Sequence, residues 1–133
     1  MRLKISGFDK TLMRTAIAFY MKYLNISKKD ISVLLIVGDD VMEETGRCYP
    51  STDNSQFMIT IKEEKRNLSE VYLTLAHEMV HIKQFLYQDL QGYRKSRSKD
   101  IAYRELWYEK EAYALEGEML IAFVTFMKAT MAR

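Results

Sequence analysis

The only two histidines of this chain, His77 and His81, stand four residues apart in the stretch TLAHEMVHIKQF, with Glu78 beside the first. An α-helix has about 3.6 residues per turn, so both imidazoles can reach one ion from the same face. The flanking residues are mostly apolar, and unpaired polar groups would be costly to bury among them. The pattern therefore indicates a metal site on a helix. The alternative is a chance pentad whose histidines are solvated or hydrogen-bonded in a core.

The spacing His-Glu-x-x-His also suits zinc chemistry. A catalytic zinc has three protein ligands and an open position for water, and neutral imidazole binds it at roughly 2.0 to 2.1 Å. Glu78 is angled beside the metal, where it can take a proton from that water. We therefore predict His77 and His81 as ligands of one Zn²⁺ per chain and Glu78 as the general base.

The third protein ligand has to be a carboxylate, because the chain has no further histidine. The metzincin pattern needs Gly and His at two later positions, which are Gln84 and Tyr87 here, so that class is excluded. The last predicted helix offers five glutamates instead: Glu105, Glu109, Glu111, Glu116 and Glu118.

The helical faces separate these glutamates. Glu111 shares its face with Trp107 and Leu115, and this apolar face is expected to turn towards the core. Glu109 lies about 200° round the helix on the same side as Glu116, and both are predicted to face solvent. The pattern thus predicts Glu111 as the third zinc ligand.

Apolar periodicity predicts one domain, residues 1–133, of the α+β class. We expect an N-terminal helix, a small three-stranded mixed sheet, the helix with the histidines, and a long C-terminal helix that carries the third ligand. The predicted strands are 31–37, 45–49 and 57–62. The first predicted helix follows Asp9, the second is capped by Asn67 or Ser69 and ends at Gln91-Gly92, and the third covers about 101–129.

The balance of charged residues bears on which partners the chain is expected to bind. The 20 basic and 18 acidic residues leave a net charge of +2, which does not indicate a nucleic-acid or membrane partner. The basic segment with Arg94, Lys95, Arg97 and Lys99 is predicted to be a solvated connection, with nucleic-acid contact as the alternative. A single cysteine, Cys48, and an N-terminus without an apolar leader predict a cytoplasmic protein.

The pentad HEMVH, followed thirty residues after His81 by Glu111 in WYEKEAYALE, resembles the gluzincin metallopeptidases. The chain is most similar to their minimal single-domain bacterial and phage members, over roughly residues 55–120. The resemblance implies a zincin-like fold, zinc held by His77, His81 and Glu111, and an edge strand that receives an extended peptide, which FMITIK matches in order. Family members carry an Asp four residues after the ligand Glu, and this chain has Leu115 there.

These features together predict a zinc-dependent peptidase. The alternative is a non-hydrolytic, zinc-stabilised binding or regulatory module of phage or bacterial origin. Candidates for stabilising the oxyanion are Tyr103, Arg104 and Tyr108, and Glu118 is a candidate for orienting a ligand histidine.

Overall fold

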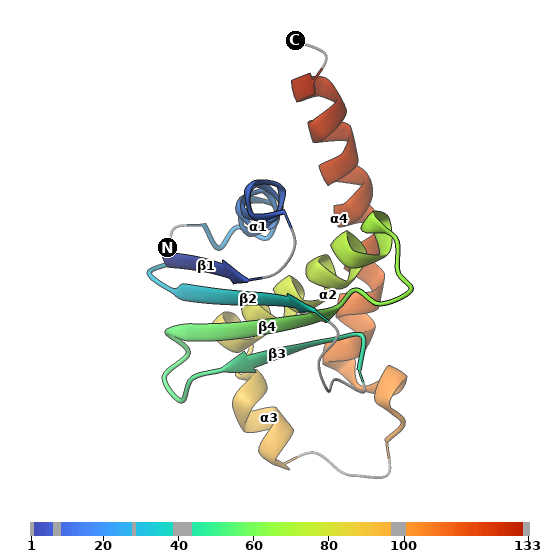
Figure 1. Ribbon diagram of the computed structural model, residues 1–133. Helices are drawn as coiled ribbons and strands as arrows, with labels where there is room; N and C mark the ends of the chain where they lie inside the picture. The colour runs from blue at the N-terminus through green and yellow to red at the C-terminus, as the bar shows by residue number, and fades with distance from the viewer. Residues whose placement is uncertain (1, 7–8, 28, 39–43, 97–100, 132–133) are drawn as a thin grey trace.

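The computed structural model describes residues 2–6, 9–27, 29–38, 44–96 and 101–131 and has an α+β architecture (Figure 1). Its elements in chain order are β1 (Arg2–Ser6), α1 (Lys10–Tyr23), β2 (Ser32–Gly38), β3 (Gly46–Pro50), β4 (Gln56–Lys62), α2 (Leu68–Tyr87), α3 (Leu90–Ser96), the 3₁₀ helix η1 (Tyr103–Glu105) and α4 (Trp107–Met131). In these ranges, no helix has the length and apolar character needed to cross a membrane.

The sheet is mixed, with strand order β1-β2-β4-β3. β2 pairs in parallel with β1 and β4, and β3 pairs antiparallel with β4. The three expected strands are present, and β1 adds a fourth that we had not predicted. The expectation that FMITIK is the edge strand is wrong, because β4 pairs on both sides and β3 lies at the edge. The alternating hydrophobicity of β4 indicates that one face of the strand is buried, but it does not indicate how many strands pair with it.

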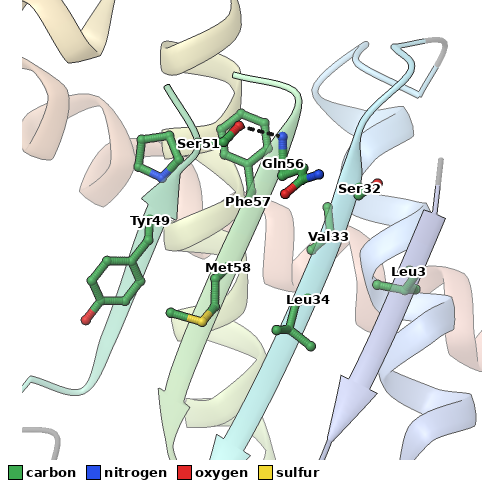
Figure 2. Close-up of a pocket in the computed structure, with 10 residues that line it drawn as sticks. Leu3, Ser32, Val33, Leu34, Tyr49, Ser51, Gln56, Phe57 and Met58 are labelled. Atoms are coloured by element: carbon green, nitrogen blue, oxygen red, sulfur yellow. Dashed lines mark hydrogen bonds between the residues drawn. The ribbon is translucent and has the colours of Figure 1, made fainter. Parts of the chain in front are cut away.

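One face of the sheet is covered by helices α1 and α2 (Figure 1). The residues that point to this side are buried: Val33, Leu35, Val37, Phe57, Ile59 and Ile61. On the opposite face, Figure 2 shows Leu34, Tyr49 and Met58 pointing away from the helices, around a shallow pocket. The histidines belong to the helical layer, so this pocket is separate from the candidate metal centre.

Helix α2 begins and ends for local reasons. The Asn67 side chain accepts a hydrogen bond from Glu70 N at 2.9 Å, and Glu70 completes a capping box. The helix ends at Tyr87 instead of Gln91, because Asp89 adopts a left-handed conformation with φ 49° and α3 starts anew at Leu90. The segment predicted as a polar connection therefore begins inside a helix.

Helix α4 begins later than predicted, at Trp107 instead of residue 101. Leu106 is extended, with ψ 135°, and separates η1 from α4. The helix packs along α2, and its buried positions are Tyr108, Glu109, Ala112, Met119 and Phe123. A carboxylate of α4 is thus carried into the interface with the histidine helix.

Candidate metal centre

Helix α2 holds the histidine pair between the sheet and α4. His77 and His81 are only 7% and 2% exposed, and Glu78 is 5% exposed. One potential ligand atom from each of these three residues lies within 4.8 Å of the others. Nearly every position of this part of α2 is buried, so polar side chains here need partners.

Glu109 of α4 supplies that partner. Its Oε1 lies 2.8 Å from His77 Nε2 and 3.0 Å from His81 Nε2, and the residue is fully buried. Glu111 instead accepts a hydrogen bond from Gln84 Nε2 at 2.9 Å and lies 3.5 Å from Lys83 Nζ, partly exposed. The prediction that Glu111 turns inward and Glu109 outward is wrong.

The error has a physical cause. The buried stripe of α4 runs through Tyr108, Ala112, Met119 and Phe123, which recur at helical spacing. Glu109 lies on this stripe, but its carboxylate made the face look solvated. A charged side chain that pairs with buried histidines is itself buried, so polarity does not predict exposure at such a cluster.

The second nitrogen of each histidine also has a partner. His77 Nδ1 lies 3.0 Å from Glu116 Oε2, and His81 Nδ1 lies 2.7 Å from Gln84 Oε1. Gln84 Nε2 in turn donates to the Tyr108 carbonyl oxygen at 2.9 Å. Such partners fix the orientation of ligand histidines and are a common feature of metal sites. The solvent-facing position predicted for Glu116 is therefore wrong.

Glu118 does not take part. Its Oε1 accepts a hydrogen bond from the Tyr23 hydroxyl at 2.9 Å, in an exposed contact between α4 and α1. The prediction that Glu118 orients a ligand histidine is wrong. Glu118 follows Glu116 by two residues, about 200° round the helix, so it lies on the side opposite Glu109 and Glu116.

The electrostatics follow from these contacts. Burial lowers the pKa of His77, but hydrogen bonds to Glu109 and Glu116 outweigh it and raise the pKa to about 9. Burial raises the pKa of Glu109, but the bonds from His77 and His81 outweigh it and hold the pKa well below its usual range. Burial raises the pKa of Glu78, and His81 and His77 offset part of that effect. The centre is a buried, strongly coupled acid–base cluster.

The donor set fits a divalent cation. Two imidazole nitrogens converge on one carboxylate oxygen, and imidazole and carboxylate are both zinc ligands. The other oxygen of Glu109, Oε2, is buried and makes no well-formed hydrogen bond with the described residues, although the Tyr103 hydroxyl lies near enough to interact with this carboxylate. A buried carboxylate oxygen without a partner is costly, and a bound cation would remove that cost.

Two pockets open beside the centre. The His77 pocket is lined by Leu73, Thr74, His77, Arg104, Tyr113 and Glu116, and the His81 pocket by Arg47, Cys48, His81, Arg94 and Tyr108. Four residues line both pockets: Glu44, Gly46, Glu78 and Tyr103. Glu78 therefore borders both pockets, where a molecule bound in either one can reach its carboxylate.

The three predicted oxyanion candidates all border these pockets. Burial and hydrogen bonding to the Glu109 carboxylate raise the pKa of the Tyr103 hydroxyl, so it remains a neutral donor. The Arg104 guanidinium lies 4.4 Å from the ring centroid of Tyr113, in the His77 pocket. Tyr108 is buried, with its ring 6.1 Å from that of His81. Tyr103 alone of the three lines both pockets.

Gly46 is a site residue that our sequence analysis missed. A Cβ at this position of β3 would collide with Thr74 Cγ2 and would lie 3.2 Å from Glu78 Oε2. The absent side chain lets the edge strand approach α2 at the predicted base. An isolated glycine in a predicted strand is a signal for such close backbone approach.

We expect Gly46→Ala to destabilise the protein by about 1 to 3 kcal/mol, because the added methyl overpacks against Thr74. Gly117→Ala is the matched control. Nothing lies within 4 Å of a Cβ at Gly117, which is helical, so alanine should stabilise the protein by about 0.5 to 1 kcal/mol. Urea unfolding of both variants measures the difference, and equal stability of the two would contradict the close approach.

No protein-family model matches the chain, and no curated protein or solved structure matches it either. The side chains of this site therefore provide the evidence for function. Its main elements are the converging His77, His81 and Glu109, the neighbouring Glu78, and the pockets on both sides.

Proposed function

We propose that the protein is a zinc-dependent hydrolase that cleaves an extended peptide. The observation that carries the proposal is the approach of His77 Nε2 and His81 Nε2 to one oxygen of Glu109, at 2.8 and 3.0 Å. The resemblance to minimal gluzincins supports it with Glu109 in place of Glu111. Glu116 then holds the first histidine, the task of the family Asp four residues after the ligand Glu, a position that Tyr113 occupies when Glu109 is the ligand.

His77, His81 and Glu109 would hold the zinc. When bound, zinc supplies Lewis acidity and makes water a stronger acid. Glu78 takes the proton of the attacking water and passes it to the leaving amine, which is general base and then general acid catalysis. Tyr103, a neutral phenol at the meeting point of both pockets, donates a hydrogen bond to the developing oxyanion.

The edge strand β3 supports a peptide substrate. β3 pairs with β4 on one side only, and its residues Gly46, Arg47 and Cys48 line the His81 pocket. An extended peptide can add to such an edge through main-chain hydrogen bonds. The scissile bond would then lie over Glu78, which borders both pockets.

The first test is metal content paired with turnover. We expect the purified protein to bind one zinc per chain and to cleave members of a mixed peptide pool. Chelation should stop cleavage, and added zinc should restore it. Stoichiometric zinc with no cleavage of any peptide, together with unfolding on chelation, would favour the zinc-stabilised binding module. The contacts of Glu109 and Glu116 with His77, which connect α4 to α2, also support that alternative.

We also expect zinc to bind more tightly as pH rises. In the metal-free protein Glu109, Glu116 and Glu78 face His77, whose pKa is raised to about 9, so its ring carries a proton at neutral pH. Zinc binds the neutral ring and must displace that proton. Affinity should therefore rise about tenfold per pH unit between pH 6 and 8, the slope for one displaced proton. Competition with a chromophoric chelator measures it, and a flat profile would contradict the assignment.

A further inference from the structure

Arg94 stands out in the His81 pocket. Its Cζ lies 5.1 Å from the ring centroid of Phe85 and 5.5 Å from that of Tyr108. Stacking of this kind uses the faces of the guanidinium and leaves its N–H edge available. The prediction that Arg94 belongs to a solvated connection is therefore wrong, and Arg97 and Lys99 of that segment lie outside the described residues.

The guanidinium of Arg94 makes no ion pair or hydrogen bond with any described residue, and its charge acts from a distance on Glu78 and Cys48, whose pKa values it lowers. The other cation of the pocket, Arg47, lies 3.5 Å from Glu44. Arg94 is partly buried, on α3, in the same pocket as Glu78 and His81. A guanidinium that lies over two rings and keeps unused donors favours a carboxylate ligand, which it can bind with two parallel hydrogen bonds.

The direction of β3 tells which part of a peptide would meet Arg94. β3 starts at Gly46, which lines both pockets, and continues through Arg47 and Cys48, which line the His81 pocket alone. Antiparallel pairing is the more frequent arrangement of neighbouring strands. A peptide added antiparallel to β3 would therefore place the residues before its scissile bond in the His81 pocket.

We propose that Arg94 selects peptides with an Asp or Glu side chain on the N-terminal side of the scissile bond. The proposal rests on the proposed function and names its substrate class, an acidic peptide. The carboxylate of the substrate meets the free edge of the guanidinium, while Glu78 remains available to the attacking water.

Peptide hydroxamates provide a test without turnover. The probes are acetyl tripeptide hydroxamates, which chelate zinc through the hydroxamate and place their residues on the N-terminal side, with Glu or Gln at each position in turn. Titration calorimetry on the zinc-loaded protein should show at least one Glu compound binding about tenfold more tightly than its Gln partner. The preference should weaken at high salt.

Variants assign the preference to one side chain. Arg94→Gln should bring the Glu-to-Gln affinity ratio close to one, whereas Lys95→Gln, an exposed neighbour on α3, should leave it unchanged. Equal affinities of the Glu and Gln compounds for the wild-type protein would overturn the proposal, as would equal weakening of all compounds by Arg94→Gln. The wild-type comparison needs no variant, so it stands even if Arg94→Gln fails to fold.

Two further outcomes are informative. If no hydroxamate prefers the zinc-loaded protein to the metal-free protein, the proposed hydrolase function fails, and the selection by Arg94 fails with it. A succinyl hydroxamate dipeptide with a free C-terminal carboxylate tests the opposite peptide direction. Suppose that this compound binds more tightly than its C-terminal amide, that Arg94→Gln removes the difference, and that the Glu compounds show no advantage. Arg94 then binds a terminal carboxylate, and the proposed selection of an acidic side chain is overturned.

Discussion

Glu109→Ala is expected to abolish stoichiometric zinc binding, whereas Glu111→Ala leaves it intact. Glu109 Oε1 is the atom on which both histidine Nε2 atoms converge, and the side chain is fully buried. Loss of an outer partner of a ligand already costs about 10- to 100-fold in metal affinity, so loss of the ligand should cost at least about 100-fold. Zinc analysis after dialysis, with a competing chelator for the affinity, measures the effect.

The two variants form a matched pair. Both remove one carboxylate from the same part of α4, and the polar partners of Glu111 among the described residues are Gln84 and Lys83. Circular dichroism should show that both retain their helices. Stoichiometric zinc in Glu109→Ala, or its loss in Glu111→Ala, would contradict the site as the structure presents it.

The choice between these two glutamates shows what sequence patterns can predict here. His77, Glu78 and His81 follow from one short motif, because residues one and four apart on a single helix have a fixed geometry. Glu109 comes from another helix, and its position depends on how α4 rotates against α2. Hydrophobic periodicity normally gives that rotation, but the buried stripe of α4 contains the carboxylates of the site itself.

A signal for the correct rotation is present in the sequence. Tyr108, Ala112, Met119 and Phe123 form one apolar stripe over four turns. The face of Glu111 was instead assigned from the shorter set Trp107, Ala114 and Leu115. Starting the helix at residue 101 instead of Trp107 also added polar residues to the comparison. An apolar stripe over several turns predicts the buried face of a helix more reliably than a short one, because a few polar residues on that face change the pattern less.

The strands of the sheet could be predicted from local sequence, but their order in the sheet could not. Strands β2 and β4 follow from β-branched and alternating runs, which depend on local sequence. The edge position of β3 depends on which strands pair, and pairing partners are distant in sequence: β2 lies between β1 and β4. Gly46 has its role only because β3 lies at that edge and crosses α2 near Glu78.

Glu78→Gln should separate metal binding from catalysis. Glutamine keeps the size of the side chain but cannot accept the proton of water, so hydrolysis should fall by about 10²- to 10⁴-fold. Zinc content should stay near one per chain, because the histidines and Glu109 remain. Turnover of the cleaved peptides and zinc analysis on the same preparation measure both effects.

The control for Glu78→Gln is Glu105→Gln, which removes an exposed carboxylate 3.1 Å from Lys110. That surface pair contributes little to stability, so both turnover and zinc content should stay at wild-type values. Full hydrolysis in Glu78→Gln would assign the base to another group. Loss of zinc would instead make Glu78 a metal ligand, a role that is compatible with the 4.8 Å limit on the distances between its carboxylate oxygen and the two histidine nitrogens. Loss of turnover with zinc retained would identify Glu78 as the proton acceptor, because the zinc-loaded variant would then lack a group that accepts the proton of the attacking water.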